Sequence, residues 1–211
     1  MSDTTVVAHI LQRVSLRSGP LFVAIQGPQG SGKTFLSAQL KSCLTSPPHL
    51  LNVAVLSIDD LYLPHDRLVA LAAENPNNPL LNGRGQPGTH DVGCGKQILD
   101  KLKSQSDVVE LPRFEKSLFN GEGDRLPMGL QDATLVQAPV DIVIFEGWCV
   151  GFSSISLEDL HRKWIGVWQE ERGKLGLSDT LKETDISLIN EKLKEYEQHL
   201  WPFFDVFIQV S

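Results

Sequence analysis

Apolar side chains recur every three or four residues over residues 4–17, and a Gly-Pro pair follows, so this segment is predicted to form a helix. Residues 21–26 form a short apolar run between Pro and Gly, which predicts a fully buried strand. A glycine-rich turn leads to a second helical pattern over 35–44, and a second buried strand is predicted over 52–57. Strand, helix and strand in this order predict a βαβ unit whose two strands are parallel.

The middle of the chain interrupts this regular pattern. Ten of the fourteen residues 75–88 are Asn, Pro or Gly, so we expect an irregular loop over 75–91. A loop of this length inside a compact domain is usually functional or disordered. The polar segment 112–134 is also predicted to be irregular. The remaining patterns predict helices over 92–102 and 186–200 and strands over 108–111, 140–145 and 206–210.

Strands that alternate with helices predict an α/β fold, with three layers (α/β/α) around a mainly parallel central sheet. The length of 211 residues fits about one domain. Lys and Arg number 19 against 26 Asp and Glu, which gives a net charge of −7. This balance argues against nucleic-acid or anionic-membrane partners, but it permits a local positive pocket for a small anion.

The cysteines and the apolar runs indicate where the protein resides. The three cysteines are far apart, without the paired spacing of a zinc site or a disulfide framework, which predicts free thiols in a reducing compartment. No apolar run approaches the roughly 18 residues of a membrane span, and the N-terminus lacks the apolar core of a signal peptide. We therefore expect a soluble cytoplasmic protein, and the sequence leaves nuclear presence open.

The strongest motif lies between the first predicted strand and the next helix, and it matches G-x-x-x-x-G-K-[ST]. Glycines let the backbone wrap an anion, so that successive N–H groups converge on phosphate oxygens, and the helix N-terminus adds partial positive charge. Lys33 would reach the β- and γ-phosphates, and the Thr34 hydroxyl would bind Mg²⁺. The motif predicts a nucleoside triphosphate site made by Gly27, Pro28, Gln29, Gly30, Ser31, Gly32, Lys33 and Thr34.

Acidic residues follow two of the predicted strands. Glu146 ends the apolar run 140–145, the position of a Walker B carboxylate that holds magnesium, and its Glu-Gly pair differs from the Asp-x-x-Gly usual in GTPases. Asp59 and Asp60 follow the strand 52–57. Because ligands of an open parallel sheet bind at the carboxyl ends of its strands, a carboxylate here can accept the proton of an attacking hydroxyl. For Asp60, a helix cap or a solvated side chain is an equally good interpretation.

Together these segments resemble the phosphoribulokinase, uridine kinase and pantothenate kinase group of P-loop kinases. The resemblance rests on residues 27–34, 57–62 and 145–148. Within the group, residues 78–91, 112–117, 123–125 and 146–152 are similar to the D-glycerate 3-kinase branch of plants and fungi. The phosphate loop is common to many families, whereas the loop 84–91 and the segment 146–152 are far more specific.

The resemblance implies a P-loop NTPase-type fold and an ATP-dependent kinase that phosphorylates an acceptor hydroxyl, with D-glycerate as the best single acceptor. It implies that Asp59 is the general base, that Glu146 and Thr34 bind Mg²⁺, and that Lys33 contacts the phosphates in catalysis. The segment matching residues 84–91 faces the acceptor in the related kinases. The acceptor-side residues implied in this way are Arg84, His90, Asp91, Arg113 and Lys116. An anionic acceptor suits them, because Arg and Lys bind carboxylates.

The related kinases usually continue beyond a strand like 203–210 with helices and a loop that touches the adenine, whereas this sequence ends at Ser211. We therefore expect one kinase domain over residues 1–211, shortened at its C-terminal end relative to the family. Two alternatives stay open. The first is a kinase for another small alcohol, such as a sugar, a nucleoside or a pantothenate-like compound. The second is a non-catalytic ATP-binding protein, if the shortened end abolishes turnover.

Overall fold

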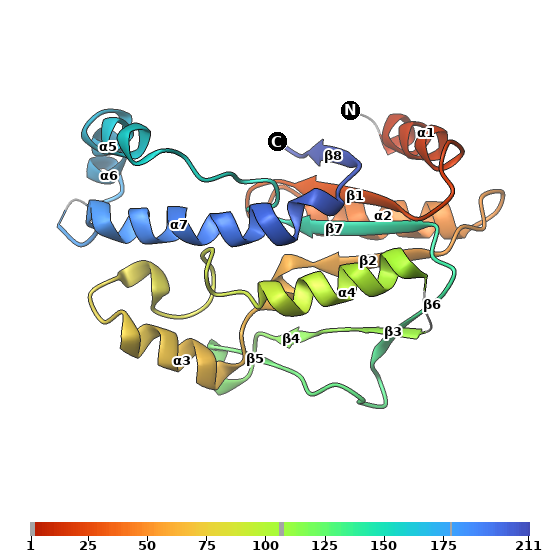
Figure 1. The fold of residues 1–211 in the computed structure, drawn as a ribbon, viewed down its shortest axis with the longest axis horizontal. Coiled ribbons are helices and arrows are strands. Elements are labelled where there is room, and N and C mark those ends of the chain that lie inside the picture. The colour runs from red at the N-terminus through yellow and green to blue at the C-terminus, as the bar shows by residue number, and fades with distance from the viewer. Residues whose placement is uncertain (1–2, 106–107, 178) are drawn as a thin grey trace.

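A four-stranded parallel sheet forms the centre of the computed structural model, which describes residues 3–105, 108–177 and 179–211. The strands lie side by side in Figure 1. Their order is β2 (Val53–Ser57), β7 (Ile142–Gly147), β1 (Leu21–Gln26) and β8 (Val206–Gln209). Strands β1 and β7 are buried at every residue, as expected for a parallel sheet covered on both faces.

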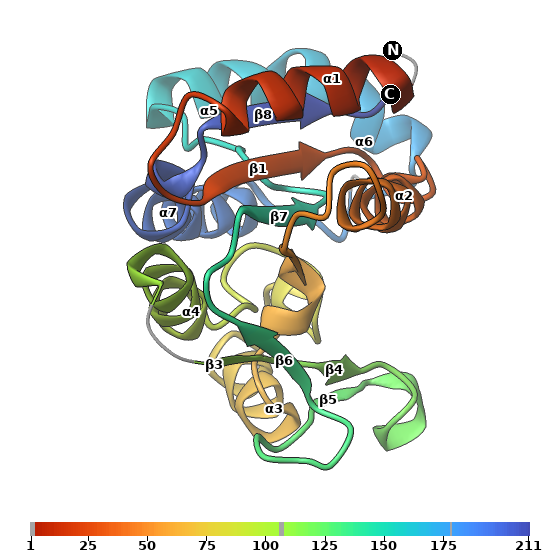
Figure 2. The ribbon, with the colours of Figure 1, turned by 90° about the vertical axis from the view of Figure 1, so that its right-hand side faces the viewer.

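Each face of the sheet has its own hydrophobic core, because successive strand residues point to opposite faces. Val23 belongs to the core shared with helices α1 and α2, and Phe22 belongs to the core shared with α4 and α7. Figure 2 shows helices on both sides of the strands. The covering helices are α1 (Asp3–Val14), α2 (Lys33–Thr45), α4 (Val92–Ser104) and α7 (Glu183–His199). Since each buried apolar side chain contributes roughly 1.5–3 kcal/mol, two filled cores stabilise the three layers. The expected three-layer α/β fold is confirmed.

Two short antiparallel strand pairs lie beyond the β2 edge of the central sheet (Figures 1 and 2). In one pair β3 binds β6, and in the other β4 binds β5. Their bounds are β3 (Val108–Leu111), β4 (Phe114–Glu115), β5 (Asp124–Arg125) and β6 (Thr134–Gln137). The segment 112–134, predicted to be irregular, therefore contains β4, β5 and the first residue of β6. Strands of two residues are too short to leave a periodic pattern in the sequence.

The remaining elements connect these layers. Two helices, α5 and α6, follow β7 in the chain and pack against each other near the start of α7 (Figure 1). The loop 75–91 is largely irregular, as expected. No helix in the described part of the chain is long and apolar enough to cross a membrane. The bounds are α3 (His65–Glu74), α5 (Leu157–Ile165), α6 (Val167–Lys174) and the 3₁₀ turns η1 (Ile58–Leu61), η2 (Pro79–Leu81), η3 (Phe119–Gly121) and η4 (Trp201–Phe203).

Candidate active site

The phosphate loop joins the buried end of β1 to the first turn of α2. Gly30 (φ 78°) and Gly32 (φ 86°) adopt left-handed backbone conformations that favour glycine, and they curl the loop in front of the helix. Gly32 is the N-cap of α2 and has no side chain to cap the first helical N–H groups. Lys33 folds back over the loop, where its Nζ donates to the Pro28 carbonyl at 3.3 Å. The result is a nest of N–H groups at a helix N-terminus, the geometry that binds phosphate.

Thr34 and Glu146 meet beside this loop. Glu146 stands on β7 opposite Ile25 of β1 and Ser57 of β2, so the central strand of the three carries it. The Thr34 hydroxyl donates to Glu146 Oε1 at 3.1 Å. Glu146 is only 4% exposed, and its Oε2 has no partner among the described residues.

This pair fits Mg²⁺. A buried carboxylate oxygen without a partner is costly unless a cation or a water satisfies it, and Mg²⁺ prefers oxygen ligands. In the described part of the chain, no cluster of three His, Cys, Asp or Glu side chains could hold a metal by itself. The remaining ligands would therefore be waters and nucleotide phosphates, which is the usual way that Mg²⁺ is bound in kinases.

Asp59 lies in η1, at the carboxyl end of β2 and next to the strand that carries Glu146. Its Oδ2 accepts a hydrogen bond from Lys116 Nζ at 2.6 Å, in an ion pair that is still partly exposed. Burial, together with the charge of Asp59, raises the pKa of Tyr62, which keeps that hydroxyl protonated. A carboxylate with nearby donors and access to solvent can accept a proton from a bound hydroxyl.

A cavity of about 750 Å³ opens in front of Asp59. The phosphate-loop residue Gln29 lines it, as do Arg84 and Lys116, so the phosphate loop, Asp59 and two cationic side chains share one space. Arg84 is held in place by its Nη1, which donates to the Gly121 carbonyl at 2.7 Å and to the Glu122 carbonyl. The other lining residues are Tyr62, His65, Leu68, Val69, Ala72, Asn82, Gly83, Gly85 and Glu122.

His90 is buried (5% exposed) and does not belong to the described residues that line this cavity. Its ring stacks on Tyr62, with centroids 4.4 Å apart, and its Nδ1 is 2.7 Å from the Tyr196 hydroxyl. Burial lowers the pKa of His90 to about 3, so the imidazole is neutral. Its Nε2 is buried without a partner among the described residues.

Asp91 and Arg113 are engaged elsewhere. One oxygen of Asp91 accepts the Cys94 N–H at 2.9 Å as the N-cap of α4, and the other pairs with Arg125 at 2.9 Å. Arg113 pairs with Asp132 at 2.6 Å. Neither is among the described residues that line the cavity. The structure does not bring these two residues to the cavity wall, and the acceptor role expected for them stays a prediction.

Several residues that line or support the cavity were not among the predicted site residues. Tyr62 belongs to the segment 57–62 that carries the family resemblance but receives no role of its own from it, and Tyr196 belongs to the apolar pattern of the helix predicted over 186–200. His65 and Glu122, whose side chains pair at 2.7 Å, come from segments with no recognisable motif. Their shared position depends on how α3 meets the β4–β5 hairpin, which is a tertiary contact.

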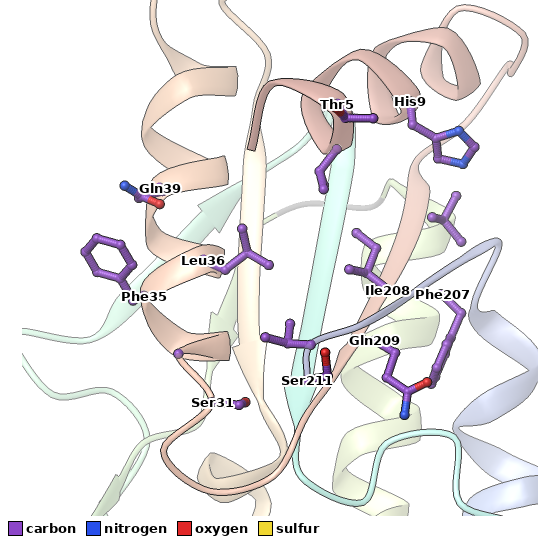
Figure 3. A pocket seen from close by; sticks show the side chains of 14 residues that line it. Thr5, His9, Ser31, Phe35, Leu36, Gln39, Phe207, Ile208, Gln209 and Ser211 are labelled. Atoms are coloured by element: carbon purple, nitrogen blue, oxygen red, sulfur yellow. The ribbon is translucent and has the colours of Figure 1, made fainter. Parts of the chain in front are cut away.

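A second, mostly apolar groove of about 640 Å³ starts at Ser31 and Gly32 of the phosphate loop. Figure 3 shows how α1, α2 and β8 each present side chains to it. Thr5 and His9 come from α1, and Phe35, Leu36 and Gln39 come from α2. Edge strand β8 and the residues after it supply the rest of the wall, including Phe207, Ile208, Gln209 and Ser211. The groove therefore lies next to the phosphate loop, and one of its walls is α2, the helix that starts at the end of this loop.

A parallel sheet with a phosphate loop after one strand and a buried carboxylate on the neighbouring strand defines a P-loop nucleotide-binding enzyme fold. No family model matches the chain. It is 41% identical over 148 residues to a probable ATP-dependent kinase, TDA10, of Saccharomyces cerevisiae, covering 64% of this chain and 48% of the yeast protein. It is 33% identical over 139 residues to the chloroplastic D-glycerate 3-kinase of Arabidopsis thaliana, covering 64% of this chain and 30% of the plant protein.

A solved structure, the D-glycerate 3-kinase of Cryptococcus neoformans, is similar over nearly the whole chain. The TM-score is 0.84 at 36% identity, and the match covers 98% of this chain and 72% of that one. The chain belongs to the D-glycerate 3-kinase family of P-loop kinases. The family resemblance expected from the motifs is thereby confirmed. The chain nevertheless spans only about a third to three fifths of the length of the first curated relatives that it matches.

Proposed function

We propose that the protein is an ATP-dependent kinase that transfers the γ-phosphoryl group to a hydroxyl of a small anionic acceptor, with D-glycerate as the best candidate. One observation carries the proposal: Asp59, Arg84 and Lys116 line a single cavity together with Gln29 of the phosphate loop. A base, two cations and a phosphate site in one space are what such a transfer requires. The names of the relatives support D-glycerate as the acceptor.

Each group has a part in the transfer. The N–H groups of the phosphate loop and Lys33 hold the β- and γ-phosphates. Thr34 and Glu146 would hold Mg²⁺, which neutralises phosphate charge when it is bound. Asp59 takes the proton of the acceptor hydroxyl as that oxygen bonds to the γ-phosphorus and the bond from phosphorus to the β,γ-bridging oxygen breaks. ADP and a phosphate monoester are the products.

The two cations select the acceptor. Arg84 presents a planar guanidinium at the cavity wall, and Lys116 already pairs with an anion there, Asp59. Both are suited to a carboxylate, which neutral sugars and nucleosides lack. A hydroxy acid therefore fits the charges better than a neutral alcohol does.

The apolar groove beside the phosphate loop is the place we propose for the nucleoside of ATP. Phe35, which is 67% exposed, gives it an aromatic side chain, and Gln39 and Gln209 offer polar groups. Aromatic stacking with a few polar contacts is a usual way to hold a purine base. We also place the reaction in the cytoplasm, because Cys43, Cys94 and Cys149 are all free thiols.

The test is an ADP-release assay with ATP and Mg²⁺ against D-glycerate, glycerol, sugars, nucleosides and pantothenate, with mass spectrometry of the product. We expect turnover with D-glycerate and formation of phosphoglycerate. Asp59→Asn should lower kcat by about 10²–10⁴ while ATP affinity is kept. Asp66→Asn, an exposed aspartate in the first turn of α3, is the matched control and should resemble the wild type. Preference for a neutral acceptor would favour the alternative kinase, and ATP binding without turnover would favour the non-catalytic alternative.

A further inference from the structure

The two consecutive carboxylates after β2 have different partners. Asp59 faces the acceptor cavity and pairs with Lys116 Nζ at 2.6 Å. Asp60 turns away and accepts the backbone N–H of Phe114, the first residue of β4, at 3.2 Å. Burial raises the pKa of Asp60, and the charges of Asp59 and Glu146 add to this rise, while the hydrogen bond from Phe114 opposes it. A half-buried carboxylate beside two others is costly, so its one contact to β4 requires an explanation.

Strand β4 needs this contact because it is a two-residue strand with one paired edge. Phe114 pairs with Arg125 of β5, and Glu115 pairs with Asp124. The Phe114 N–H lies on the other edge, where the neighbouring element is the turn η1 rather than a strand. An unpaired backbone N–H inside a protein costs free energy comparable to a lost hydrogen bond. Asp60 supplies the acceptor that a neighbouring strand would supply in a wider sheet.

Phe114 in turn positions the cavity wall. Its ring packs edge-on against Tyr62, with centroids 5.2 Å apart, and the Arg84 guanidinium lies 5.6 Å above it. The ring packs closely on Gly123 of the hairpin, where an added Cβ would lie 2.3 Å from Phe114 Cε1. Two residues further along, Lys116 reaches Asp59. One backbone N–H therefore anchors the segment that supports Arg84 and carries Lys116.

We propose that Asp60 is a positioning residue for the anionic acceptor: through the Phe114 N–H it holds residues 113–116 so that Lys116 and Arg84 face the cavity. Asp60 does not touch the acceptor and does not replace Asp59 as base. The inference rests on the proposed function, because it concerns the same acceptor site. The two neighbouring aspartates thus have different roles. Asp59 takes the proton of the acceptor hydroxyl, and Asp60 positions the cations that bind the acid group of the acceptor.

Steady-state kinetics with D-glycerate and ATP both varied test the proposal. Asp60→Ala should raise the KM for D-glycerate about tenfold or more, the scale of losing a hydrogen bond to a charged group, and leave the KM for ATP within about twofold. Asp60→Asn keeps an oxygen that accepts the N–H and should recover most of this loss. Because Asp60 acts through Lys116, adding Asp60→Ala to Lys116→Ala should raise the acceptor KM much less than it does in the wild type. Asp66→Ala is the matched control and should change neither KM.

Three results would overturn the proposal. The first is that the effects of Asp60→Ala and Lys116→Ala on the acceptor KM are independent, and the second is that Asp60→Ala raises both KM values equally. The third is that Asp60→Asn is as impaired as Asp60→Ala. A second measurement does not depend on activity or on the alanine variant folding. In amide NMR spectra, the Phe114 proton should shift upfield in Asp60→Asn, because a neutral carbonyl is a weaker acceptor than a carboxylate. An unmoved Phe114 resonance would refute the contact itself. If the wild type does not phosphorylate D-glycerate but the Phe114 resonance shifts as expected, the proposed function is refuted. The hydrogen bond between Asp60 and the Phe114 N–H would still stand.

Discussion

Gly147 offers a direct test of how tightly the two strand ends next to Asp59 and Glu146 are packed. It follows Glu146 in β7 and is buried against Ile58, which precedes Asp59. A Cβ added at Gly147 would lie 2.3 Å from Ile58 Cγ2, 2.9 Å from Ile58 Cβ and 3.0 Å from Val150 Cγ2. Distances below 3 Å are far inside van der Waals contact, so Gly147→Ala must push the ends of β2 and β7 apart.

The size of the effect follows from this crowding. Overpacking a dense core by one methyl group costs about 1–3 kcal/mol. For a chain of this size, that loss lowers Tm by about 2–12 °C. The displaced backbone carries Asp59 on one side and Glu146 on the other, and misplacing a reacting group by about 1 Å can cost up to 10²-fold in rate. We therefore expect Gly147→Ala to lower kcat by about 10- to 100-fold in addition to its effect on stability.

The assay combines urea unfolding with ADP-release kinetics at a temperature where the variant is folded. Gly19→Ala is the matched control, because a Cβ added there meets nothing within 4 Å and should change neither stability nor rate. A Gly147→Ala variant with the same Tm and kcat as Gly19→Ala would show that the two strand ends are not tightly packed. A loss of stability with full kcat would show that the strand ends move without disturbing the two carboxylates.

Three further predictions concern single side chains. Arg84→Ala should raise the acceptor KM by about tenfold or more and leave the ATP KM unchanged, with Arg84→Lys in between; equal changes in both KM values in steady-state kinetics would count against an acceptor role. Glu146→Gln should raise the Mg²⁺ concentration for half-maximal rate by about tenfold or more, and an unchanged Mg²⁺ titration would exclude Glu146 as a ligand. His90 has a pKa lowered by burial to about 3, so folding stability should fall as pH drops below the unfolded His pKa of about 6.5 and continue to fall toward 3. His90→Phe should weaken that acid dependence in urea unfolding at several pH values, and an identical pH profile would contradict the buried neutral imidazole.

The sequence predicted the elements that bury continuous apolar runs or regular apolar stripes. Helix α4 begins where its pattern placed it, and strand β7 lies two residues later than the predicted 140–145, because burial on one or both faces leaves a pattern of apolar residues in the sequence. Helices α5 and α6 were not predicted. Much of their surface is exposed, so few of their residues are constrained to be apolar. The β4–β5 pair was missed because its residues are fixed by contacts with other segments rather than by local pattern.

The candidate site also has a part that the sequence could predict and a part that it could not. The phosphate loop consists of eight consecutive residues that together form a recognisable motif. The sequence was therefore sufficient to predict the loop and its place between a strand and a helix. The roles of the acceptor-side residues depend on partners far along the chain. Asp91 forms an ion pair with Arg125, and Arg113 forms one with Asp132. His90 is oriented by the hydroxyl of Tyr196, which is 106 residues away in the sequence. No local pattern reports which of several loop charges already has a counter-ion.

The pairing of Lys116 with Asp59 connects acceptor charge to proton transfer in the proposed reaction. The chain carries a net charge of −7, so an anionic acceptor gains its affinity from contacts inside the cavity rather than from the overall field. Lys116 Nζ pairs with Asp59 Oδ2 at 2.6 Å before the reaction. When Asp59 takes the hydroxyl proton in the proposed reaction it loses its charge, and Lys116, which contacts the acid group of the bound acceptor, keeps that group or the transferring phosphoryl group as its anionic partner in exchange for Asp59. A neutral alcohol offers no acid group for this exchange. Discrimination against glycerol should therefore be visible in kcat as well as in KM, which the acceptor series measures directly.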